Sequence, residues 1–143
     1  MVAITRRETP TLRLTTLVLR SIVVLLTLAT AAIHASLGGM MFMANAVGYS
    51  VLALAMVTPG PLARYRWLIR LALIGFAAVT IAGWVAFGAR FDLAYLDKGI
   101  EVALIGILLV EQLRSDGGPA GVYRLVRRFL RGIASGTIAR HAR

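Results

Sequence analysis

Four long apolar runs dominate this sequence and limit what it can fold into. They cover residues 17–37, 40–57, 68–87 and 93–113. A helix needs about 20 mostly apolar residues to cross the hydrocarbon core of a bilayer, so each run is long enough to span it. Charged residues make up only 15% of the 143 positions, too few to give each helix of a soluble bundle a polar outer face. The sequence therefore predicts an all-α, polytopic membrane protein.

Short turn-forming segments separate the runs. Gly38 and Gly39 join the first run to the second, Pro59-Gly60-Pro61 opens the second connection, and residues 88–92 form the third. Short connections place consecutive helices side by side in opposite directions. We therefore expect an up-down bundle of four transmembrane helices.

Positive charge is distributed unevenly around these runs. All basic residues except Arg90 and Lys98 lie near the amino-terminal end of the first run, around the second connection, or after the fourth run. Because Lys and Arg next to membrane spans are retained on the cytoplasmic side, both termini should be cytoplasmic. We expect a multi-pass protein of a prokaryotic inner (cytoplasmic) membrane, with a basic cytoplasmic amino-terminal segment at residues 1–16.

A signal peptide is an alternative interpretation of the first run. Basic residues precede it, and Ala29-Thr30-Ala31 has the small-residue pattern of a cleavage site. The apolar stretch continues to Leu37, however, which is longer than the apolar region of a typical signal peptide. This length favours a membrane span.

The carboxyl-terminal segment, residues 114–143, differs from the rest of the chain because it combines apolar and basic residues at helical spacing. One predicted face carries Val122, Leu125, Val126, Phe129, Leu130 and Ile133, and the opposite face carries Arg124, Arg127, Arg128 and Arg131. Such a basic amphipathic helix is suited to anionic lipid or to an acidic partner surface. The alternative is a solvated tail that only helps to set topology. Topology also accounts for the net charge of +10, so we expect no nucleic-acid binding.

Polar side chains from all four runs are predicted to meet at one depth. Counting about 1.5 Å per residue from each external turn places them in the outer half of the membrane. The residues are His34, Asn45, Tyr49, Thr80, Lys98 and Glu101. Lys98 and Glu101, three residues apart, share a helix face and can form an ion pair, whereas we expect Asp97 to point toward the outer surface. Ionisable groups at such depth are costly and turn inward to find partners.

Two interpretations of these residues remain open. In the first they form a structural latch, a Lys98–Glu101 pair whose surrounding hydrogen bonds fix the register of the helices. In the second they form an ion or proton site, or anchor a bound polar group. We favour the latch because we expect no comparable chain of polar side chains to continue inward past Glu101.

Recognisable catalytic chemistry is missing from the sequence. It has no Cys, no Gly-rich phosphate loop, no nucleophile elbow and no paired catalytic carboxylates, so we expect no enzymatic activity and no metal site. We predict no cofactor other than bound lipid. Haem ligation by His34 is not expected, because the only other histidine, His141, falls on the opposite side of the membrane.

Several short motifs give the chain a family resemblance. They are Ile33-His34, the segment FMANAVGY at residues 42–49, Thr80, and the Tyr95-x-x-Lys98-x-x-Glu101 spacing. In these the chain resembles a group of small uncharacterised prokaryotic four-helix integral membrane proteins. The resemblance covers residues 17–113 and implies the helical architecture, without an activity to transfer.

We therefore expect a non-catalytic protein, a small accessory or structural subunit of a larger membrane complex such as a bioenergetic one. Its partners would be membrane lipids and either other membrane-protein subunits or further copies of itself. Pairs of small residues four apart, Ala44 with Gly48 and Ala78 with Ala82, allow helices to approach closely. The alternative function is a small oligomeric ion or proton channel or transporter that uses Glu101 and Lys98.

Overall fold

The computed structural model describes residues 10–115 and 118–134, and in this part of the chain every regular element is a helix. The elements are α1 (Pro10–Leu37), α2 (Met40–Val57), the short 3-10 helix η1 (Gly60–Tyr65), α3 (Arg66–Phe87), α4 (Asp92–Ser115) and α5 (Gly118–Ala134). The all-α class is confirmed. Residues 1–9 of the predicted cytoplasmic segment, and the end of the tail with His141, lie outside the described residues.

Glycines allow the chain to turn sharply where two of the helices meet. Gly38 and Gly39, between α1 and α2, have φ values of 69° and 80°, and Gly60 at the start of η1 has a φ of 82°. L-residues with a side chain rarely adopt such values, whereas glycine does so readily. The chain can therefore end α1 and begin α2 within two residues.

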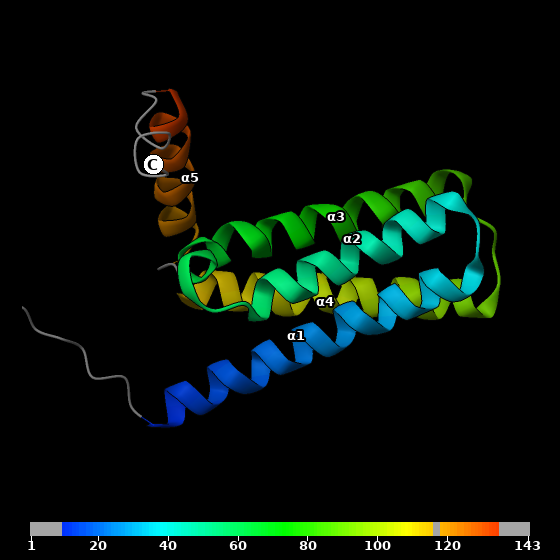
Figure 1. Ribbon diagram of the computed structural model, residues 1–143, viewed down its shortest axis with the longest axis horizontal. Coiled ribbons are helices and arrows are strands. Elements are labelled where there is room, and N and C mark those ends of the chain that lie inside the picture. Colours follow the sequence, from blue (N-terminus) through cyan, green and yellow to red (C-terminus); the bar gives the residue numbers. More distant parts are fainter. Residues whose placement is uncertain (1–9, 116–117, 135–143) are drawn as a thin grey trace, which may run out of the picture. The chain divides into compact units, whose positions relative to one another are not determined.

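The described residues up to Leu108 form one compact unit, in which α1, α2, α3 and the first part of α4 lie lengthwise beside one another (Figure 1). Among the described residues, α1 packs most extensively against α2. The fully buried apolar side chains between the helices are Tyr49, Met56, Leu73, Ala77, Leu104 and Leu108. They form a continuous core that orients the inward-facing polar residues.

Three helical segments of the described chain are long and apolar enough to cross a membrane: Leu14–Leu37, Met40–Val57 and Gly60–Phe87. Only 22% of the most apolar window of each is buried within the protein, so the greater part of their apolar surface faces outward. The fourth predicted span also forms a helix, α4, but Asp97, Lys98 and Glu101 make it more polar than the other three. A bundle with four membrane spans stays a prediction.

The described residues from Leu109 onward belong to a second unit. Its helix α5 has the two faces expected from the sequence. Val122, Leu125 and Val126 are half-buried, Leu130 of the same face is 57% exposed, and the four arginines of the opposite face are exposed. The arginines are Arg124, Arg127, Arg128 and Arg131. The amphipathic helix is thus present, and lipid or partner binding by it remains a proposal.

Gly48 on α2 permits the close approach of α3, and replacing it tests this packing. A Cβ atom at Gly48 would lie 2.6 Å from Cζ of Phe76, whose ring packs edge-on against Tyr49 with the centroids 4.8 Å apart. We expect Gly48→Leu to lower the free energy of unfolding in detergent by about 1–3 kcal/mol, because the core is then overfilled. The matched control is Gly75→Leu, since a Cβ there meets no atom within 4 Å. Equal stability of the two variants would contradict this account.

Candidate functional site

The Glu101 carboxylate lies at the centre of a buried hydrogen-bond network. This residue of α4 has no exposed surface. Its Oε1 accepts hydrogen bonds from the Tyr49 hydroxyl at 2.7 Å and from the Thr80 hydroxyl at 2.8 Å. Its Oε2 accepts one from the Lys98 ammonium at 2.7 Å. The carboxylate thus connects α2 and α3 to α4.

Asp97 belongs to the same network, so the expectation that it points toward the outer surface was wrong. It is only 2% exposed. Oδ1 accepts a hydrogen bond of 2.5 Å from the Thr30 hydroxyl on α1, and Oδ2 lies 2.9 Å from Nζ of Lys98. The physical reason is helical geometry. Residues four apart are offset by only about 40° around a helix, so Asp97 shares the inward face of Glu101.

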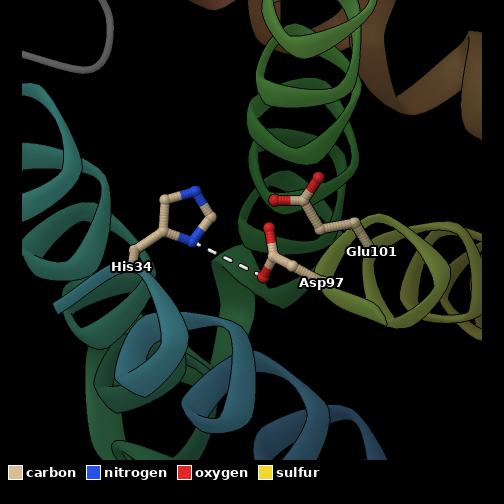
Figure 2. A group of neighbouring side chains, drawn as sticks. All are labelled: His34, Asp97 and Glu101. Atoms are coloured by element: carbon tan, nitrogen blue, oxygen red, sulfur yellow. Dashed lines mark ion pairs between the residues drawn. The ribbon is translucent and has the colours of Figure 1, made fainter. Parts of the chain in front are cut away.

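His34 joins the network from α1. Its Nδ1 lies 2.9 Å from the Thr30 carbonyl oxygen and 3.6 Å from Oδ1 of Asp97, the ion-pair contact marked in Figure 2. A carbonyl oxygen can only accept, so Nδ1 carries a proton in this arrangement. Figure 2 shows the Asp97 and Glu101 carboxylates extending from α4 toward the imidazole.

The structure brings five of the six predicted polar residues into this network, from all four long helices. We define the polar cluster as Thr30, His34, Tyr49, Thr80, Asp97, Lys98 and Glu101. Sequence reasoning missed Thr30 and Asp97. Each lies four residues from a predicted member of the cluster, and that spacing was the available indication. Asn45 differs, because none of the described residues hydrogen-bonds to its side-chain amide.

Each carboxylate oxygen in the polar cluster has a donor or cation beside it, although the charges do not balance formally. Asp97 and Glu101 supply two carboxylates, and Lys98 supplies one ammonium that contacts both. The remaining carboxylate oxygens accept hydrogen bonds from the hydroxyl groups of Thr30, Tyr49 and Thr80. Buried ions are tolerated only when their partners are arranged in this way, so removal of one member should be costly.

Geometry alone would also allow a metal ion in the polar cluster. Ligand atoms of His34, Asp97 and Glu101 all lie within 4.8 Å of one another, and histidine with carboxylates is a usual donor set for divalent transition metals. The Lys98 ammonium, however, already contacts one oxygen of each carboxylate. A metal held by these residues would lie close to this ammonium, and the repulsion between the two cations favours the internal ion pair.

A cavity of about 430 Å³ leads from one end of the unit to the polar cluster. Its outer wall comes from the end of α1, the start of α2, the end of α3 and the connection to α4, with Met41, Phe42, Trp84 and Phe87 among the apolar lining residues. Its polar lining residues are His34, Asn45, Thr80, Asp97 and Lys98. The cluster is therefore reached through the end that we predict to be external.

Buried polar residues also occur on α3 and α4 outside the polar cluster. Arg70 on α3 is only 6% exposed, and in the second unit Glu111 and Gln112 on α4 are 3% and 2% exposed. Buried polar groups thus recur on α4 after Glu101, but along this helix they are not continuous with it. Leu104 and Leu108, which come between them in the sequence, are fully buried.

No known protein family, curated protein or solved structure matches this chain. The resemblance noted in the sequence therefore stays a prediction. Function has to be inferred from the polar cluster, the cavity and the exposed helix faces.

The coupling between Lys98 and Glu101 can be measured with a double-mutant cycle. Lys98→Met leaves two carboxylates without a cation, and we expect it to destabilise the protein by about 3–5 kcal/mol. Glu101→Gln should also be strongly destabilising. The loss of unfolding free energy in the double variant should be smaller than the sum of the two single losses by about 0.5–3 kcal/mol, because the two side chains interact directly.

The measurement is reversible unfolding in detergent micelles. Asp92→Asn is the control, since Asp92 is an exposed acidic residue in the first turn of α4 and its replacement should change stability by no more than about 0.5 kcal/mol. Additive effects of the two cluster substitutions would refute the direct coupling.

Proposed function

We propose that this chain is a non-catalytic integral membrane protein with four spans, and that it serves as a small accessory or structural subunit of a larger membrane complex. The supporting observation is the polar cluster, in which every oxygen of the Asp97 and Glu101 carboxylates is engaged by Lys98, Thr30, Tyr49 or Thr80. Here the hydrogen bonds connect four helices, as expected of a latch.

Outward-facing apolar side chains support placement in a membrane. Leu25, Val51, Leu54, Val79 and Val102 are each more than half exposed, and they come from all four long helices. Exposed apolar surface on this scale is unfavourable in water but natural in lipid. The arginine distribution supports cytoplasmic termini in a prokaryotic inner membrane, and the exposed arginines of α5 suit anionic headgroups or an acidic partner.

Small residues on α3 support a protein partner. Ala78, Ala82 and Ala86 are spaced four apart and all are exposed, whereas Gly48 is used for packing within the chain. In lipid, close approach of backbones through small residues is a main source of helix association. This ridge is a suitable contact for a helix of another subunit or of a second copy.

Substitution on the ridge tests the subunit proposal. The protein, tagged and extracted from its native membrane in mild detergent, should copurify with other proteins at fixed stoichiometry. The double variant Ala78→Leu/Ala82→Leu should lose most of the copurifying proteins, because two bulky side chains keep the partner's helix away from α3. Ala32→Leu, at an exposed alanine of α1, should retain the partners. Purification of the unaltered protein as a lone stable oligomer would refute the subunit role.

A second candidate function is a small oligomeric ion or proton channel or transporter that uses Glu101 and Lys98. It is favoured by the cavity that reaches Lys98 and by the excess carboxylate in the polar cluster. Proton flux into reconstituted vesicles tests it. A transport role requires Glu101→Gln to abolish flux while Asp92→Asn retains it, and equal flux from both would exclude this mechanism.

A further inference from the structure

The cavity above the polar cluster has the properties of a small-molecule site. Its volume of about 430 Å³ falls within the range of about 300–1,000 Å³ that is usual for ligand pockets. Apolar and aromatic side chains form most of its wall, and a few polar groups gather at its inner end. Such a combination favours an amphipathic ligand that enters with its polar head first.

Unused hydrogen-bonding groups line this inner end. The Asn45 amide, which offers both donors and an acceptor, makes no hydrogen bond within the described residues. Nε2 of His34 is also without a partner in this part of the chain, because the contacts of His34 are made through Nδ1. Lys98 has three N–H donors and directs two of them to Asp97 and Glu101.

These groups select the chemistry of the ligand head. A carboxylate would be drawn to Lys98 but repelled by Asp97, which lines the same cavity. An ammonium would be drawn to Asp97 but repelled by Lys98, which also lines the cavity. A hydroxyl group avoids both conflicts, since it can donate to Nε2 of His34 and accept from Lys98 or Asn45.

We propose that the cavity binds a neutral amphipathic alcohol or phenol, with the hydroxyl group placed among His34, Asn45 and Lys98 and the apolar body against Phe42 and Trp84. The inference goes beyond the subunit role and does not depend on it, because the site lies within a single chain. The polar cluster would then both hold the helices together and form the floor of the site.

Trp84 provides a direct measurement, because it lines the cavity and Trp67 is the only other tryptophan. In Trp67→Phe protein reconstituted into nanodiscs, a ring-brominated para-hexylphenol should quench Trp84 fluorescence saturably. Unlabelled para-hexylphenol, and decanol as the aliphatic member of the class, should displace it. The methyl ether para-hexylanisole, which cannot donate, should compete roughly tenfold less well or worse, because the acceptor on the protein stays unpaired.

Two pairs of tests separate the site from simple partitioning into lipid. Gly83 lines the cavity and Gly75 does not, although both belong to α3 and a Cβ at either meets no atom within 4 Å. Gly83→Leu should abolish saturable quenching, and Gly75→Leu should leave it unchanged. Asn45→Leu, which breaks no hydrogen bond of the described structure, should weaken binding roughly tenfold.

Other results would overturn the proposal. They are quenching that never saturates, equal competition by the phenol and its methyl ether, or tighter binding of para-hexylbenzoate or para-hexylbenzylammonium. Displacement by the phenol but not by decanol would restrict the class to phenols. Since none of these measurements involves a partner protein, failure here would leave the subunit proposal standing.

Discussion

The buried carboxylate of Glu101 is the constraint on which the rest of this structure depends. An ionised group without exposed surface is stable only if charge and hydrogen bonds replace the water it has lost. Lys98 supplies the charge from the same helix, while Tyr49 and Thr80 supply hydrogen bonds from α2 and α3. Helix α4 is therefore held in one rotation and one register, which apolar packing in a membrane specifies poorly.

The buried carboxylate of Asp97 also needs hydrogen bonds in place of water, and it accepts one from Thr30 on α1. Two carboxylates around one ammonium are an unusual composition for a purely structural pair, because a simple ion pair needs only one carboxylate. The polarity that holds the helices together also creates a polar floor for the cavity, where Lys98, Asn45 and His34 keep unused hydrogen-bonding capacity. Structural and binding roles are thus physically linked at this site.

Local patterns in the sequence predict several features of the fold. The all-helical class, the glycine turn between α1 and α2 and the two faces of α5 follow from apolar run length, turn chemistry and helical spacing. Counting residues from the external turns also selected His34, Tyr49, Thr80, Lys98 and Glu101, because depth along a helix depends only on sequence position. Asp97 was misplaced, although its four-residue offset from Glu101 was present in the sequence.

The sequence by itself determined which segments are helical, the position of each polar residue along its helix and the asymmetry of charge, since these depend on the order of residues along a single element. Only the tertiary structure decided which polar groups are partners. Thr30 donates a hydrogen bond to Asp97, whereas the side chain of Asn45 forms no hydrogen bond with a described residue. Such pairings depend on how the helices are rotated about their axes. The cavity is likewise absent from any single helix, because its walls come from four of them.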